Sequence, residues 1–249
     1  MRRTATLVTD LTDQPRHRPA DAFPNDRREA SYPNNLYRIT TLGRPSTLAR
    51  SATKRGFDII VATLALLVLL PGLLSIAAAI KLTTRGPVLF RQRRYGLNNR
   101  MFEIYKFRTM YSDKCDRTGV RQTCTADQRV TPVGKVLRRF SLDELPQLLN
   151  VLQGDMSLVG PRPHVPGMLA AGVAYETLVP NYFERHRVRP GVTGLAQARG
   201  FRGSTVDAAL AKARIDLDLM YIREWSFLLD LRIIAETVWV EFLRLGRGI

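Results

Sequence analysis

The sequence predicts a mixed α+β fold that is mainly helical, with a membrane hairpin joined to a small globular domain. Three observations lead to this prediction. Residues 59–80 form an uncharged apolar run, residues 86–110 alternate like two short strands, and several later segments carry apolar residues at helical spacing. We expect a disordered basic arm over residues 1–50, the membrane hairpin over residues 51–85, and the main domain over residues 86–249.

The charge of the chain calls for an anionic partner. Its 249 residues carry a formal net charge of +16, with a pI near 10.7. Such an excess of positive charge favours binding to nucleic acid, to an anionic membrane surface or to a phosphate-bearing substrate. No helix-turn-helix or zinc pattern supports the first of these. Cys115 and Cys124 have no second pair, and the three histidines lack the spacing of metal ligands.

The first fifty residues predict a disordered, basic arm. They hold repeated proline and asparagine and no sustained helical or strand period. Met1-Arg2-Arg3 is followed by no apolar run of the length that a secretory signal requires. A solvated tail and a tail that lies on anionic lipid both fit this composition.

The apolar run is long enough to cross a bilayer. Residues 59–80 would extend about 33 Å at the helical rise of about 1.5 Å per residue. Cations lie on both sides of the run, which fits poorly with a single crossing under the positive-inside rule. Pro71-Gly72 near the middle predicts a kink or a break. We therefore expect a re-entrant helix-break-helix hairpin, with a kinked spanning helix and a buried soluble helix as the alternatives.

Residues 86–110 predict two strands around a turn at Tyr95–Asn99. This segment is dense in cations. A solvated, lipid-facing basic surface is one interpretation. The other turns Lys106 or Arg108 inward to bind phosphate.

A polar loop over residues 111–130 comes next, and Thr131-Pro132 then begins a short helix. Ser141 and Glu144 have the spacing of a capping box. Proline is tolerated only in the first turn of a helix, so Pro146 predicts a helix that begins near Leu142 or Asp143.

Asp143 and Glu144 place two adjacent acids in a basic neighbourhood. Side-by-side carboxylates repel one another unless a cation or a reaction requires them. At a helix start, the dipole favours an ionised Asp143 and a bound phosphate nearby. Glu144 fits both a capping role and a chemical role. Arg162, between Pro161 and Pro163, is either a rigidly aimed guanidinium or part of a structural turn that pairs with a surface acid.

The pattern of the remaining residues predicts helices separated by a turn. We expect a helix over residues 166–188, a rigid basic turn over residues 187–194 and a charged helix over residues 206–223. An amphipathic helix over residues 225–245 carries aromatic residues that suit either a membrane interface or ordinary core.

Several motifs occur together in an order that resembles a known family. They are Lys54-Arg55-Gly56-Phe57-Asp58, Lys106-Phe107-Arg108-Thr109-Met110, Ser141-Leu142-Asp143-Glu144-Leu145-Pro146-Gln147, Gly154 through Pro163, Arg189-Pro190-Gly191-Val192-Thr193-Gly194 and Asp218 through Ser226. The chain resembles the bacterial sugar transferase family, the monotopic polyprenyl-phosphate phosphoglycosyl transferases that initiate exopolysaccharide or capsule synthesis.

This resemblance implies a reaction and a place in the cell. A UDP-sugar would donate its sugar-1-phosphate to undecaprenyl phosphate at the cytoplasmic face of the bacterial inner membrane, and UMP would leave. Inner-membrane lipid and magnesium are the further partners that it implies, with no nucleic acid. Glucose or galactose is the expected sugar, and homo-oligomerisation is left open.

The resemblance also implies roles for individual residues. Asp143 would be the nucleophile of a covalent phosphosugar-aspartate, and Glu144 the neighbouring carboxylate that binds magnesium. Lys106, Arg138 and Arg162 would contact phosphate. These roles agree with elementary chemistry, because a carboxylate can form an acyl phosphate and Mg²⁺ favours one or two carboxylates plus phosphate oxygens.

The membrane segment both matches the family and departs from it. Arg55 and Asp58 match the cap region of the family's hairpin, which implies a structural role. Better-known members often have Ser-Pro at the hairpin break, where this chain has Leu70-Pro71-Gly72. The partner of the broken backbone is therefore not identified by the resemblance.

Overall fold

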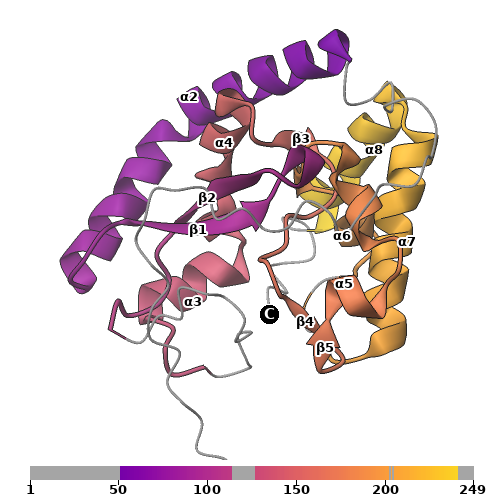
Figure 1. The fold of residues 1–249 in the computed structure, drawn as a ribbon. Coiled ribbons are helices and arrows are strands. Elements are labelled where there is room, and N and C mark those ends of the chain that lie inside the picture. The colour runs from indigo at the N-terminus through magenta and orange to yellow at the C-terminus, as the bar shows by residue number, and fades with distance from the viewer. Residues whose placement is uncertain (1–50, 114–126, 202, 204, 241–249) are drawn as a thin grey trace, which may run out of the picture. The chain divides into compact units, whose positions relative to one another are not determined.

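The computed structural model describes residues 51–113, 127–201, 203 and 205–240, whose helices and strands are drawn in Figure 1. The predicted arm over residues 1–50 lies outside the described residues, as does most of the predicted loop with its two cysteines. The α-helices are α2 (Ala52–Thr83), α3 (Pro132–Arg139), α4 (Gln147–Gln153), α5 (Tyr175–Leu178), α6 (Leu195–Ala198), α7 (Ala208–Glu224) and α8 (Phe227–Val238). The strands are β1 (Leu89–Tyr95), β2 (Met101–Phe107), β3 (Ser157–Val159), β4 (Leu169–Ala170), β5 (Val173–Ala174) and β6 (Gly191–Thr193). Three short 3₁₀ helices are η1 (Leu97–Asn99), η2 (Leu142–Glu144) and η3 (Tyr182–Arg187). The prediction of a mixed, largely helical fold is confirmed.

The predicted pair of strands is present as the antiparallel hairpin β1–β2. Phe90 lies opposite Lys106, and Arg94 lies opposite Phe102. The turn contains η1, where Asn98 has a φ of 53°. Asparagine tolerates this left-handed conformation better than most residues, which explains its place in the turn.

Helix α2 contains the predicted apolar run but is not broken into two helices. Figure 1 shows it as one unbroken, curved ribbon, and Pro71 lies inside it. Proline removes one backbone donor, yet the remaining hydrogen bonds of a helix this long continue past that position. Ser75 Oγ donates to the Pro71 carbonyl at 2.9 Å, so the backbone beside the proline also gains a side-chain partner. The predicted re-entrant hairpin is therefore not confirmed, although α2 is long and apolar enough to cross a membrane.

Both ends of α2 contact the globular domain. Near its start, Lys54 Nζ lies 2.6 Å from an oxygen of Asp230 on α8. Asp58 accepts hydrogen bonds from Ser157 Oγ at 2.8 Å and from the Leu158 backbone N–H at 3.1 Å. Near its other end, Ile80 is buried in a cluster with Phe107 and Leu137. The ends of a 32-residue helix are thus held by the same domain.

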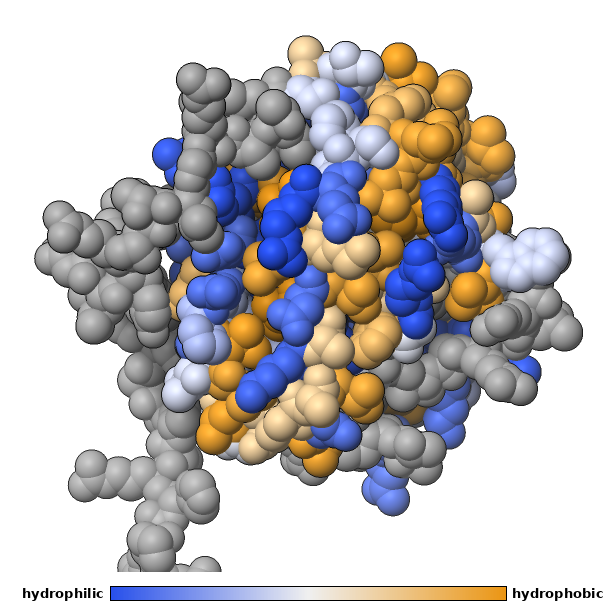
Figure 2. Space-filling model, turned by 90° about the vertical axis from the view of Figure 1, so that its right-hand side faces the viewer, coloured by the Kyte–Doolittle hydropathy of each residue, from blue (hydrophilic) through white to orange (hydrophobic). Residues whose placement is uncertain are grey.

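The middle of α2 and one side of α8 expose large apolar side chains. On α2 these include Leu64, Leu67, Val68, Leu70 and Leu74, and on and just after α8 they include Phe227, Leu228, Leu231, Val238 and Trp239. Figure 2 views the molecule from the side of α7 and α8 and shows apolar side chains gathered beside hydrophilic ones. The opposite side of α8 is buried through Asp230 and Ile233, so this helix serves the core and also presents an apolar surface.

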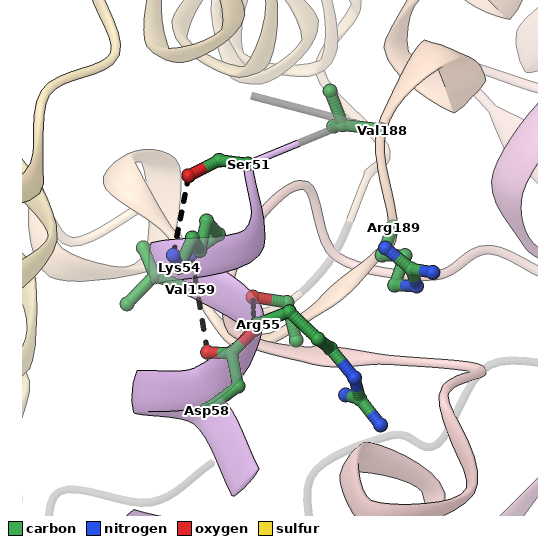
Figure 3. Close-up of a pocket in the computed structure, with 8 residues that line it drawn as sticks. Ser51, Lys54, Arg55, Asp58, Val159, Val188 and Arg189 are labelled. Atoms are coloured by element: carbon green, nitrogen blue, oxygen red, sulfur yellow. Dashed lines mark hydrogen bonds and ion pairs between the residues drawn. The ribbon is translucent and has the colours of Figure 1, made fainter. Parts of the chain in front are cut away.

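Two arginines from distant parts of the chain hold the end of α4. Arg55 donates to the Val151 and Leu152 carbonyls at 2.7 and 3.1 Å, and Arg189 Nε donates to the Gly154 carbonyl at 2.8 Å. Figure 3 shows both side chains extending away from Lys54 and Asp58 in the small pocket that they line. Cations at a helix C-terminus satisfy its last carbonyls and complement its dipole. The structure therefore gives Arg55 and Asp58 structural roles at the base of α2.

The main core lies between α2, α4, α8 and the parallel pair β3–β6. Its fully buried members include Ala62, Val151, Met156, Val159 and Ile233. Strand β6 occupies the segment predicted as a rigid turn, and Gly191 pairs with Ser157 of β3. A Cβ on Gly191 would overlap the Gly160 backbone, so the two segments approach this closely only because both residues are glycine.

The helix predicted over residues 166–188 is wrong. This segment forms the hairpin β4–β5 and the short helices α5 and η3. Gly167 and Gly172 have φ values of 67° and 80°, and these left-handed residues stop a continuous helix. The aromatic spacing comes instead from a buried cluster in which Tyr175 stacks on Tyr182 with ring centroids 5.7 Å apart.

Candidate active site

The two acids lie in a tight turn just before helix α4. Asp143 and Glu144 belong to η2, and α4 begins at Gln147 with Pro146 as the preceding cap residue. The sequence therefore placed the start of the α-helix one turn too early. Ser141 has a left-handed backbone, with a φ of 53°, and makes no side-chain cap hydrogen bond. Of the two roles that the sequence left open for Glu144, the structure does not show the capping box.

Glu144 pairs with two of the predicted phosphate-binding cations. Lys106 Nζ lies 2.6 Å from Glu144 Oε1. Arg162 donates to both carboxylate oxygens, with Nη2–Oε1 at 2.5 Å and Nη1–Oε2 at 3.0 Å. A bidentate guanidinium–carboxylate pair fixes orientation as well as charge. Glu144 therefore holds Lys106 and Arg162 side by side next to Asp143.

The β1–β2 hairpin determines which of its cations faces the site. Lys106 points to the acids from the end of β2, as one of the two interpretations predicted. Arg108 is buried elsewhere, where its guanidinium donates to Thr84 Oγ1 at 2.9 Å and to the Arg85 carbonyl beyond the end of α2. Arg108 thus anchors the end of α2 and does not enter the site.

Arg162 is aimed by a backbone that is held at several points. The Gly191 N–H donates to the Pro161 carbonyl at 3.0 Å, which fixes the loop against β6. Arg185 Nη2 donates to the carbonyl of Arg162 itself at 2.5 Å. Arg185 is in turn paired with the buried Asp218 at 2.6 Å. The guanidinium of Arg162 therefore enters the site from a rigid loop.

Arg138 approaches from the last turn of α3. Its Nε donates to Thr109 Oγ1 at 2.8 Å. The charges of Lys106, Arg138 and Arg162 all act to lower the pKa of Asp143. The structure thus brings together the five residues that the sequence nominated.

The surroundings shift the pKa values of Asp143 and Glu144 in opposite directions. Burial raises the pKa of Asp143, the nearby cations oppose that rise, and the charge of Glu144 adds to it. Burial also acts to raise the pKa of Glu144, but the charges of Arg162 and Lys106 overcome it and hold that pKa well below its usual value. Neighbouring acids with opposed shifts serve different chemical roles. Glu144 stays ionised as an ion-pair partner, whereas Asp143 is the more basic of the two carboxylates.

Sequence reasoning missed three polar residues that support the site. Arg94 donates through Nη1 to the Pro163 carbonyl at 3.1 Å, and its pKa is shifted by burial and by the charge of Arg162. Arg185 and Asp218 fix the backbone of Arg162, as described above. Strand alternation could have identified Arg94, because it lies two residues from Gln92 on the buried face of β1.

Asp143 and Glu144 are the acidic groups available for a metal ion in this site. The described part of the chain has no group of three or more His, Cys, Asp or Glu side chains able to hold one. Mg²⁺ is often bound by one or two carboxylates plus substrate phosphates, so the pair fits such an ion in chemical type. Both oxygens of Glu144 are already paired with cations, which leaves Asp143 as the less engaged carboxylate.

Comparison with known proteins identifies the family. The sequence pattern of the family described as bacterial sugar transferase matches residues 49–244. The chain belongs to the bacterial sugar transferase family. The matched range contains every residue of the candidate site.

The relatives of this sugar transferase include proteins named for polysaccharide synthesis. It is 55% identical over 195 residues to the exopolysaccharide production protein PSS of Rhizobium leguminosarum bv. phaseoli, covering 78% of this chain and 97% of the relative. It is 52% identical over 185 residues to an undecaprenyl-phosphate glucose phosphotransferase of Komagataeibacter xylinus, covering 74% of this chain and 35% of the relative. It is 48% identical over 190 residues to the UDP-glucose:undecaprenyl-phosphate glucose-1-phosphate transferase of Escherichia coli K12, covering 76% of this chain and 40% of the relative. The chain thus spans nearly all of the first relative but well under half of the other two.

Proposed function

We propose that this sugar transferase moves a sugar-1-phosphate from a UDP-sugar to undecaprenyl phosphate and releases UMP. The observation that carries the proposal is the buried Asp143 beside Glu144, Lys106 and Arg162 in a chain of this family. The names of the relatives from K. xylinus and E. coli state this acceptor and glucose as the sugar. Glucose is therefore the donor sugar that we propose first.

The chemistry that we propose has two steps. A carboxylate oxygen of Asp143 attacks the phosphorus that bears the sugar, and the bond from that phosphorus to the UMP oxygen breaks. UMP leaves, and an acyl phosphate joins the sugar phosphate to Asp143. A phosphate oxygen of undecaprenyl phosphate then attacks the same phosphorus and frees the carboxylate. Splitting one transfer into two steps is the usual advantage of a covalent intermediate.

The cations supply the electrostatic part of this proposal. Phosphoryl transfer spreads negative charge over the oxygens of the moving group, and fixed positive charges stabilise it. Lys106, Arg138 and Arg162 approach Asp143 from a strand, a helix and a rigid loop. Because Glu144 orients two of them before substrate arrives, little reorganisation is needed during the reaction.

Magnesium remains part of the proposal. Glu144, with Asp143 beside it, would hold the ion together with the substrate phosphates. A bound Mg²⁺ would neutralise charge on those phosphates. Glu144, whose oxygens pair with Lys106 and Arg162, would be the carboxylate that binds the ion, and Asp143 would keep an oxygen for the attack on phosphorus.

We further propose that α2 enters one leaflet and does not cross the membrane. A helix that crosses places its ends on opposite sides of a core about 30 Å thick. The ends of α2 are instead both held by the catalytic domain, through Asp230 and Leu158 at one end and Phe107 and Leu137 at the other. The exposed apolar residues of α2 and α8 would then face lipid, with the domain on the cytoplasmic side of the inner membrane.

A UMP-release assay tests the proposed reaction. Membranes that contain the protein are supplied with undecaprenyl phosphate and with either UDP-glucose or UDP-galactose, and membranes with Asp143→Asn serve as the blank. We expect UMP and a glucose-linked lipid product to appear in equal amounts with UDP-glucose. Release of UDP in place of UMP would contradict sugar-1-phosphate transfer.

A further inference from the structure

Arg94 shares the inner face of the β1–β2 hairpin with Lys106. Phe90 and Arg94 lie on the same side of β1, and Phe90 is the cross-strand partner of Lys106. Arg91 and Arg93 alternate to the other side, where both are exposed. Four residues along a strand correspond to about 13 Å. Arg94 and Lys106 therefore approach the site from opposite ends of the hairpin.

Arg94 is held in place without a charged partner among its hydrogen-bond acceptors. Nη2 donates to Gln92 Oε1 at 2.5 Å, and Nη1 donates to the Pro163 carbonyl at 3.1 Å. Nε is buried and has no hydrogen-bond partner within the described residues. Burial and the charge of Arg162 lower the pKa of Arg94 to about 10, so the side chain is still protonated at neutral pH. Its guanidinium is thus a fixed cation beside a second cation.

With Arg94, the positive charges of the site outnumber the negative ones. It joins the three cations that the sequence nominated, against the two carboxylates of Asp143 and Glu144. A site with such a surplus of positive charge attracts an anion, and guanidinium groups suit phosphate oxygens in particular. A UDP-sugar offers two linked phosphates to this site.

The position of Arg94 indicates which phosphate it would contact. Arg94 Nη1 donates to the carbonyl of Pro163, the residue that follows Arg162. Lys106, toward the other end of the same hairpin face, instead pairs with Glu144 beside Asp143. Arg94 therefore lies next to the Arg162 loop, away from the end of the hairpin where Lys106 meets the acids. We propose that Arg94 binds the phosphate that leaves with UMP, while Lys106 and Arg138 contact the phosphate that Asp143 attacks. This assignment rests on the proposed function.

Calorimetric titration with UMP tests the assignment without requiring turnover. The full chain in detergent is compared as wild type, Arg94→Gln and Arg93→Gln. The last is a matched control, because Arg93 is the neighbouring arginine on the exposed face. A charge-assisted contact to phosphate predicts UMP binding about tenfold or more weaker for Arg94→Gln. Arg93→Gln should bind UMP as the wild type does. If the wild type itself fails to bind UMP, the proposed function fails.

Kinetics with the lipid acceptor separate the two phosphate sources. Arg94→Gln should raise the KM for UDP-glucose and leave the KM for undecaprenyl phosphate unchanged. A variant that binds UMP normally but needs more undecaprenyl phosphate would overturn the assignment and place Arg94 at the acceptor. Loss of the bond to Pro163 could also loosen the fold, so thermal unfolding is measured for each variant. Arg94→Lys keeps the charge, and its UMP affinity should lie between those of wild type and Arg94→Gln; equal affinity for Lys and Gln variants would contradict a charge contact.

Discussion

The substitution Asp230→Asn should loosen the attachment of α2 to the domain. Asp230 is fully buried and receives Lys54 Nζ at 2.6 Å, Tyr221 Oη at 2.8 Å and Trp225 Nε1 at 3.1 Å. Removing one partner of a buried ion pair typically costs about 3–5 kcal/mol, because the other charge stays buried. Asp58 lies 4.0 Å from Lys54 and offsets part of this loss, so we expect about 3 kcal/mol. A typical domain has only about 5–15 kcal/mol of unfolding free energy, so the change is large.

Urea unfolding in detergent micelles, followed by tryptophan fluorescence, measures this change. Asp216→Asn is the control, because Asp216 is an exposed acid on α7. The double variant Lys54→Met with Asp230→Asn removes both charges and should recover much of the lost stability. A loss below about 1 kcal/mol for Asp230→Asn, equal to that of a surface pair, would refute the reasoning.

Four further predictions concern Asp143 and magnesium. Asp143→Asn should abolish turnover while the protein stays folded and membrane-bound, and mass spectrometry of the wild type with donor alone should find a labile phosphosugar on Asp143; residual transfer by the variant would exclude this residue as nucleophile. Because burial raises the pKa of Asp143, activity should fall as the pH falls through a value above 3.8, and a pH–rate profile whose acid limb lies at or below that value would contradict the assignment. The same shift makes the ionised folded state less stable as the pH rises through that window, so Asp143→Asn should unfold at a higher temperature than the wild type at pH 7. EDTA should stop turnover and added Mg²⁺ should restore it, whereas full activity in EDTA would remove magnesium from the proposal.

Local sequence signals predicted the parts of the structure that depend on neighbouring residues. Thr131-Pro132 begins α3, with Thr131 Oγ1 accepting from the Gly134 N–H at 2.9 Å. Gly154 ends α4 with a φ of 93°. Both are decided within one helical turn, where capping rules apply directly.

Features that depend on contacts between residues far apart in the chain could not be predicted from these local signals. Glu144 had the spacing of a capping residue, but Lys106 and Arg162 compete for its oxygens from 38 and 18 residues away. Two cations, one of them bidentate, bind a carboxylate more strongly than a single neutral backbone N–H does, so the distant cations prevail. Pairing of β3 with β6 likewise brings together segments more than thirty residues apart, and no local spacing of apolar residues predicts this pairing.

The gathering of the site residues was predictable only through the resemblance to a family. Their order along the chain identified Lys106, Arg138 and Arg162 as companions of Asp143. Strand alternation places Arg94 and Arg93 on opposite faces of β1. It does not predict that the Arg94 guanidinium donates to the Pro163 carbonyl. Nothing in the sequence indicated that Asp218 pairs with Arg185, or that Arg185 in turn fixes the Arg162 backbone.

Helix α4 links the start of α2 to the candidate active site. Its seven residues extend about 10 Å, with Asp143 just before one end and the Arg55 side chain of α2 bound to the carbonyls at the other. In the membrane orientation proposed for α2, a tilt of that helix, such as a change in acyl-chain length would cause, would pull on α4 through Arg55. The thickness of the surrounding membrane would then tune the turnover rate by a route separate from the binding of the lipid substrate.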